Sequence, residues 1–167
     1  MLLKRLRTSG KGESVGLSVA GNNVTLFHDP ETCLPAMLDA IEDASREILL
    51  EMYWFASDRT GWEFAEALSA RARAGVRVRV IYDGIGSVMA EDEMFQRMRR
   101  AGCQVAEYNP VAPWQARFRL GVLNNRDHRK MVLVDGRVAL VGGVNIGDEW
   151  ASIEGGGEGF RDDVVKI

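Results

Sequence analysis

The chain has 167 residues, of which 46% are hydrophobic and 27% charged, and its formal net charge is −3. This composition is typical of one globular domain with an ordinary core, and the lack of a basic excess argues against a nucleic-acid partner. Cys33 and Cys103 stand apart without metal-ligand spacing, so we expect two buried free thiols and no metal.

The N-terminal stretch comes first in chain order. Its hydrophobic run is too short for a signal peptide, and its basic residues lie among glycines and serines. These basic residues are Lys4, Arg5, Arg7 and Lys11. We therefore expect a flexible basic leader over residues 1–22 and a single domain over residues 23–167.

The domain begins with alternating strand and helix patterns. Apolar residues on one helical face, such as Leu34, Met37 and Ile41, predict a helix, and the continuous apolar run from Ile48 predicts a central strand. By the same criteria, strands are expected at 24–28, 47–55, 76–83 and 103–109, and helices at 30–47, 61–75 and 90–102. This order with short connections predicts the α/β class, with a mixed, largely parallel sheet flanked by helices.

Two irregular segments follow. Residues 110–127 have no clean periodicity, which is typical of a long functional loop, and residues 148–160 form a second, glycine-rich loop before a strand at 162–167. Earlier in the chain, three small or acidic residues stand at a strand's carboxyl end, where open α/β sheets often bind ligands. These residues are Asp83, Gly84 and Ser87.

Between the two loops we expect a hairpin over residues 128–145. Asp135-Gly136 between apolar runs predicts a two-residue turn, because both residue types tolerate the positive φ of a type I′ turn. The register that follows from this turn places Lys130 opposite Val141.

The ends of this hairpin carry the residues suited to chemistry. With that register, His128, Lys130, Gly143 and Asn145 share one face, and the glycine leaves open space beside the imidazole. The ammonium and the amide suit phosphoryl oxygens, and an imidazole can act as a nucleophile near neutral pH. The sequence therefore predicts a site for a phosphoryl group.

The complete pattern is more specific than its parts. It reads His-x-Lys, four residues, Asp, six residues, Gly-Gly-x-Asn, and it resembles the HKD motif of the phospholipase D superfamily. The stretches "LEMYWFASDRTGWEFAEALSARARAGVRVRVIYDGIGS" and "FRDDVVKI" are similar to the N-terminal half of bacterial cardiolipin synthases. Such synthases carry two motifs and this chain carries one, so we expect a fragment of a two-motif protein or a chain that pairs with another motif.

The resemblance implies a phosphatidyltransferase or phosphodiesterase that forms a phosphohistidine and uses no metal or other cofactor. The motif's matching positions are His128, Lys130, Asp135, Gly142, Gly143 and Asn145. By this resemblance His128 is the nucleophile, Lys130 and Asn145 hold the phosphoryl oxygens, and the two glycines support them.

The carboxylates are assigned separately. By resemblance, Asp162 in "FRDD" matches the carboxylate that orients the nucleophilic histidine, and Asp163 is the alternate. Asp135 belongs to the catalytic motif, but its place in the turn indicates that it organises the nearby backbone rather than reacts. His28 lacks a lysine two residues on, which argues against it as the second catalytic histidine.

The resemblance also implies partners. They are a phosphatidylglycerol-like phospholipid and an anionic membrane surface, with the protein peripherally bound at the cytoplasmic side of the inner membrane. Apolar residues of the long loop, Trp114, Phe118, Leu120, Val122 and Leu123, are candidates for dipping into that surface. The single motif and the apolar faces of the hairpin predict a homodimer or a second HKD half.

Two alternatives stay open. One is a phosphodiesterase acting on nucleic acid, against which the acidic pI of about 5.5 counts. The other is an inactive half-domain that serves as an assembly module.

Overall fold

The computed structural model describes residues 14–111, 124–153 and 156–167. In this part of the chain, eight strands form one sheet in the order β1-β2-β8-β7-β6-β3-β4-β5. The strands are β1 (Ser14–Val19), β2 (Asn22–Phe27), β3 (Glu47–Met52), β4 (Arg77–Asp83), β5 (Gln104–Tyr108), β6 (Met131–Val134), β7 (Val138–Gly142) and β8 (Val164–Lys166). The helices are α1 (Pro30–Glu42), α2 (Arg59–Arg73) and α3 (Asp92–Arg100), and a short 3-10 helix covers Asp148–Trp150.

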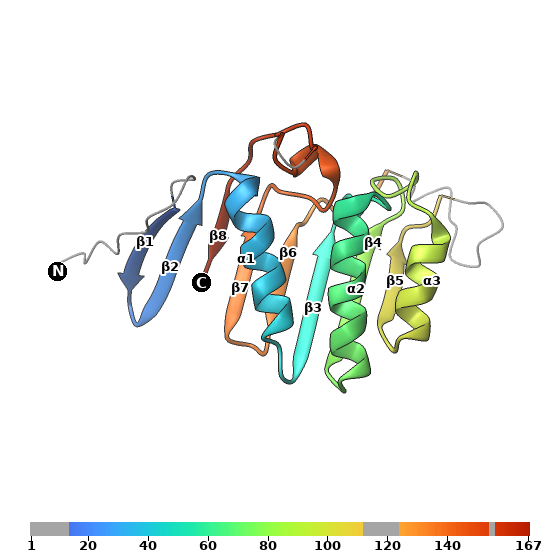
Figure 1. Cartoon of the computed structure of the whole chain (residues 1–167), viewed down its shortest axis with the longest axis horizontal. Coiled ribbons are helices and arrows are strands. Elements are labelled where there is room, and N and C mark those ends of the chain that lie inside the picture. The colour runs from blue at the N-terminus through green and yellow to red at the C-terminus, as the bar shows by residue number, and fades with distance from the viewer. Residues whose placement is uncertain (1–13, 112–123, 154–155) are drawn as a thin grey trace.

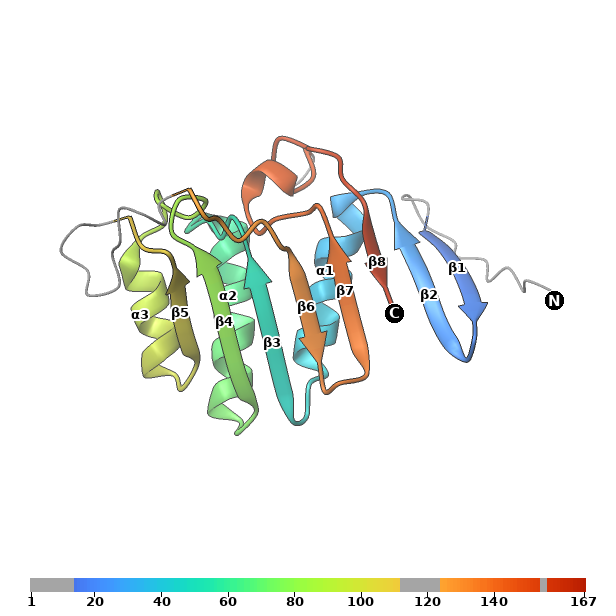
Figure 2. The ribbon, with the colours of Figure 1, turned by 180° about the vertical axis from the view of Figure 1, so that it is seen from behind.

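The three α-helices cover one face of the sheet, in front in Figure 1 and behind in Figure 2. Each helix turns an apolar stripe toward the inward-facing residues of the central strands, and this contact forms the core. Its buried members include Met37, Ile41, Ile48, Leu50, Phe64, Leu68, Val78, Val80, Phe95 and Met98. Among the described residues, no helix covers the opposite face, so the sheet is flanked on one side.

The sheet is mixed, as expected, but it is not largely parallel. Only β3–β4 and β4–β5 pair in parallel, while five of the seven neighbouring pairs are antiparallel. The prediction rested on strand–helix–strand units, and these give parallel pairing only where a helix connects two neighbouring strands. β6, β7 and β8 join the sheet without such a helix and run antiparallel to their neighbours.

The predicted hairpin exists, but its register differs by one residue. Val134 pairs with Val138 and Met131 with Val141, whereas the two-residue loop predicted Lys130 opposite Val141. Asp135 and Gly136 adopt the expected positive φ of 55° and 65°. The next residue in the chain then stays unpaired, which adds one residue to the loop.

This shift turns every side chain of β7 to the face opposite the one that the two-residue loop predicted. One face of the hairpin carries Val132, Val134, Val138 and Leu140, which pack beneath the helices. The other carries Met131, Leu133, Ala139 and Val141 and lies on the face of the sheet without a described helix. Because side chains alternate along a strand, a one-residue slip always has this effect.

The expected leader over residues 1–22 is wrong for residues 14–22, which form β1 and a tight turn into β2. Ala20 and Gly21 both have positive φ, at 50° and 85°. An alanine is unusual at such a position, whereas Gly21 is the residue type that this turn favours. Residues 1–13 and the five apolar residues expected to meet the membrane, Trp114 to Leu123, lie outside the described residues.

Candidate functional site

The topology brings several distant segments to one edge of the sheet. β3 and β4 are parallel and end there, and β6 begins there because Met131 pairs antiparallel with Glu51. β7 ends there, and β8 begins there with Val164 paired to Gly142. The loops at the upper edge in Figure 1 are these connections. As a result, residues near 53, 128–130, 142–145 and 162 become neighbours.

Lys130 is the buried cation of this edge, with 4% of its surface exposed. Its Nζ donates a hydrogen bond to the carbonyl oxygen of His128 at 2.8 Å and lies 4.9 Å from the centre of the Tyr53 ring. Burial lowers the pKa of the ammonium below its ordinary value, while the charges of Asp162 and Asp127 act in the opposite direction. The ammonium is therefore desolvated and held at a fixed place.

His128 lies directly beside it but remains exposed. Its ring centre is 4.5 Å from that of Tyr53, with the planes tilted by 55°. The same tyrosine thus touches both the imidazole and the ammonium. An exposed imidazole above a buried cation is an arrangement in which a ring nitrogen can reach a phosphorus atom whose oxygens meet the cation.

Asn145 is also buried, at 5% exposure. Its Oδ1 accepts a hydrogen bond from the backbone N–H of Trp54 at 3.1 Å. This bond orients the amide, because only its oxygen can accept, and it leaves the amide N–H groups as donors. The expected phosphate donor is thus fixed to the loop after β3.

Gly143 faces a carboxylate rather than open space. A Cβ built on Gly143 would lie 2.0 Å from Oδ1 and 2.1 Å from Oδ2 of Asp162, so only glycine admits this carboxylate. Asp162 Oδ1 accepts the backbone N–H of Asp163 at 2.9 Å. The Asp162 carboxylate does not accept a hydrogen bond from His128 in this structure, and it acts on the charge of Lys130 instead.

Asp163, the alternate, has a different partner. Its Oδ1 lies 3.0 Å from Nδ1 of His28, which follows β2 at the same edge. The two histidines therefore have separate surroundings, since His128 contacts Tyr53. Gly142 plays a backbone role, because a Cβ there would meet the carbonyl oxygen of Asp163 at 2.1 Å.

Asp135 is not brought to the other motif residues. It lies at the far end of β6, and its carboxylate accepts hydrogen bonds from the backbone N–H groups of Ser45, Arg46 and Glu47 and from the Ser45 hydroxyl. The backbone bonds from Glu47 and Ser45 hold the pKa of Asp135 well below its ordinary value. Its grouping with the catalytic residues is thus corrected, whereas its predicted role in organising backbone is confirmed.

The suggested ligand residues at the end of β4 and in the loop after it form hydrogen bonds with backbone N–H groups. Asp83 is fully buried, and its carboxylate accepts the N–H groups of Ile85, Gly86 and Asp127. Ser87 accepts the N–H of Phe55 at 3.0 Å. These bonds hold the loop after β4 and the residue before His128, so they help to position the backbone around the site.

A cavity of about 550 Å³ adjoins Tyr53. The loops after β3 and β4 line it, together with Glu149. Across the described ranges, no group of histidine, cysteine or acidic residues has the arrangement of a metal site. Likewise, no helix within those ranges is long and apolar enough to span a bilayer.

Tyr53 was missed by the sequence reasoning. A signal existed, because this tyrosine lies near the carboxyl end of the apolar strand that the sequence predicted as central over residues 47–55. Because β3 pairs with β6, the residue that follows β3 lies beside His128 and Lys130. That adjacency is a property of the strand order, which the sequence did not provide.

Comparison with known proteins agrees with this geometry. The family described as "Cardiolipin synthase, PLD-like domain" matches residues 37–152. Cardiolipin synthase 1 of Bacillus anthracis is 36% identical over 132 residues, which are 78% of this chain and 25% of that protein. The chain therefore spans about a quarter of the length of this curated relative.

Two solved structures share the fold. Nuc of Salmonella typhimurium, a phospholipase D family member, aligns with a TM-score of 0.64 and 19% identity over 86% of this chain and 81% of that one. The phosphatidylserine synthase of Haemophilus influenzae aligns with a TM-score of 0.67 and 14% identity over 91% of this chain and 34% of that one. The fold is thus that of the phospholipase D-like proteins. The chain belongs to the cardiolipin synthase family of PLD-like domains.

Proposed function

We propose that this chain carries a phospholipase D-type catalytic motif for phosphatidyl transfer on a phosphatidylglycerol-like phospholipid at a membrane surface. The observation that carries the proposal is the buried ammonium of Lys130, held against the carbonyl of His128. An anionic partner offsets the cost of desolvating this ammonium. A phosphodiester supplies the anion and places its phosphorus beside the exposed imidazole. Membership of the cardiolipin synthase family supports the phospholipid as substrate.

The reaction follows in two displacements. A ring nitrogen of His128 attacks the phosphorus of the donor lipid, forming a P–N bond, and the P–O bond to the departing alcohol breaks. A second histidine donates the proton that this alkoxide takes. The hydroxyl of an acceptor alcohol then attacks the phosphohistidine and returns its proton to that second histidine, which frees His128. Lys130 and Asn145 donate to the phosphoryl oxygens, where negative charge grows in both transition states.

The second histidine comes from another copy of the motif in this proposal. The sheet face without a described helix carries half-buried or exposed apolar side chains from neighbouring strands: Leu49, Ile81, Met131, Leu133 and Val141. A patch of this kind favours burial against a partner. A symmetric homodimer, or a second HKD half, would bury it and bring two motifs into one site.

The test is conversion of phosphatidylglycerol in vesicles to cardiolipin and glycerol, followed by mass spectrometry. The wild-type chain should form both products and an acid-labile, base-stable phosphoenzyme, and His128→Ala should form none of them. His28→Ala is the matched control, because it removes the other histidine at the same edge, and it should retain turnover. A phosphoenzyme that survives His128→Ala and disappears in His28→Ala would overturn the assignment.

The same preparation separates the alternatives. Cleavage of DNA and bis-p-nitrophenyl phosphate without any lipid product would identify a nuclease-type phosphodiesterase. A folded chain inactive on all three substrates would be an assembly module. Sedimentation in parallel should show a dimer, and a fully active monomer would contradict the requirement for two motifs.

A further inference from the structure

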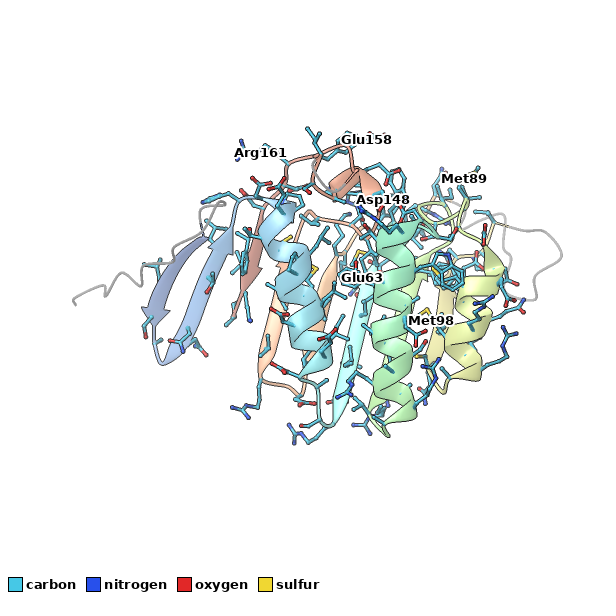
Figure 3. All side chains as sticks on the ribbon, viewed as in Figure 1. Glu63, Met89, Met98, Asp148, Glu158 and Arg161 are labelled. Atoms are coloured by element: carbon cyan, nitrogen blue, oxygen red, sulfur yellow. The ribbon has the colours of Figure 1, made fainter. Side chains whose placement is uncertain are left out.

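The loop between β4 and α3 exposes three large apolar side chains. Ile85 is 40% exposed, Val88 57% and Met89 90%. We call these three residues the apolar tip. No charged residue stands between Asp83 and Glu91 in the sequence, so nothing in this loop offsets their exposure. Figure 3 labels Met89 at the edge of the molecule that carries the site loops.

The exposure is built into the backbone of the loop. The buried carboxylate of Asp83 accepts the N–H groups of Ile85 and Gly86, and the N–H of Ala90 bonds to the carbonyl of Ser87 at 3.0 Å. These bonds close the loop and keep the apolar tip from folding inward. An exposed apolar cluster held in this way indicates a binding surface rather than a missing piece of core.

The apolar tip is joined to the catalytic residues. Gly86 packs on the backbone of Tyr53 so closely that a Cβ would lie 2.0 Å from the tyrosine carbonyl oxygen. Between this loop and Tyr53 lies the cavity of about 550 Å³, which Ile85, Val88 and Met89 also line. Tyr53 also touches His128 and Lys130. Tyr53 thus borders both the cavity beside the apolar tip and the proposed phosphoryl site.

We propose that the apolar tip inserts into the interfacial region of a lipid bilayer and thereby places the neighbouring site of Tyr53 and His128 against the lipid headgroups. The inference rests on the proposed function, because a phospholipid substrate is what makes a bilayer the occupant. Uncharged apolar side chains bind a bilayer by burial of area. Acidic residues such as Glu91 and Asp92 follow the loop directly, so the contact does not rest on attraction to anionic lipid.

The experiment measures co-sedimentation of the chain with sucrose-loaded vesicles of phosphatidylcholine, with and without phosphatidylglycerol. The double variant Val88→Ser/Met89→Ser should bind at least about tenfold more weakly than the wild type. Binding of the wild type should change little between about 0.1 and about 0.5 M NaCl, since screening acts on charges and not on apolar burial. The matched control is Val19→Ser, because Val19 is 40% exposed at the opposite edge of the sheet, and it should bind as the wild type does.

A second readout separates this inference from the proposed function. The double variant should hydrolyse soluble bis-p-nitrophenyl phosphate at the wild-type rate while its turnover of lipid in vesicles falls about tenfold or more. Unchanged vesicle binding in the double variant, or binding abolished by salt, would overturn the role of the apolar tip and leave phosphatidyl transfer standing. Binding that depends on the tip without any lipid product would support the tip and refute the proposed reaction.

Discussion

Replacement of Lys130 by methionine separates catalysis from stability. The side chain is 4% exposed, makes one hydrogen bond to the His128 carbonyl and contacts the Tyr53 ring. A charged hydrogen bond contributes about 1.5–3 kcal/mol and a cation–π contact about 0.5–2 kcal/mol, against the cost of desolvating the ammonium. Methionine keeps the volume and needs no hydration. We therefore expect the free energy of unfolding to change by no more than about 1 kcal/mol.

Turnover should respond very differently. Removing one fixed donor from a developing phosphoryl charge costs about 10²–10³ in rate, or about 2.7–4 kcal/mol. The assays are urea unfolding and phosphodiester turnover at equal folded concentration. Lys166→Met is the matched control, because Lys166 lies in β8 away from the site, paired with Thr25 and Leu140. A Lys130→Met protein that keeps turnover within about threefold would refute the reasoning, since the charge would then have no catalytic use.

The pH dependence of the unfolding free energy tests how burial affects the ammonium of Lys130. Burial lowers the pKa of Lys130 in the folded protein, so the unfolded chain binds this proton more strongly. Stability from this residue therefore rises with pH between the lowered pKa and the ordinary lysine value of about 10.4. Lys130→Met lacks that rise. The unfolding free energy of the wild type should therefore increase relative to that of Lys130→Met as pH increases through this window.

Further outcomes are expected for the glycine and the carboxylates of the motif and for a chelator. Gly143→Ala should displace the Asp162 carboxylate, which a Cβ would approach to 2.0 Å, and thereby lower turnover. Asp162→Asn should also lower turnover. If both losses have this one cause, the double variant loses no more than either single variant, and a loss equal to the product of the two would contradict it. If Asp163→Asn has the larger effect, the assignment of the carboxylate in this segment is off by one residue. Asp135→Asn should lower the urea midpoint but not the turnover of folded protein, and because folding lowers the pKa of Asp135, the wild type should lose its advantage as pH falls below about 4. Turnover should be insensitive to EDTA, and inhibition by the chelator would reveal a metal site.

The local sequence determined the elements and the chemistry. Apolar spacing identified the helices and strands from β2 onward, because burial of one face imposes a period on the chain regardless of the partner. The motif from His128 to Asn145 predicted a phosphoryl site, since few other functions need these side chains at this spacing. The role of Asp135 also followed from sequence, as an aspartate in a turn has nearby N–H groups to accept.

Tertiary structure decided which parts meet. Pairing of β6 with β3 and of β8 with β7 brings Tyr53 to His128 and Asp162 to Gly143, across gaps of 75 and 19 residues that no local pattern spans. It also set the hairpin register, because one unpaired residue after Gly136 reverses the faces of β7. A sequence specifies period and residue type within one element, whereas strand order and register depend on packing between elements, and the geometry of this site depends on both.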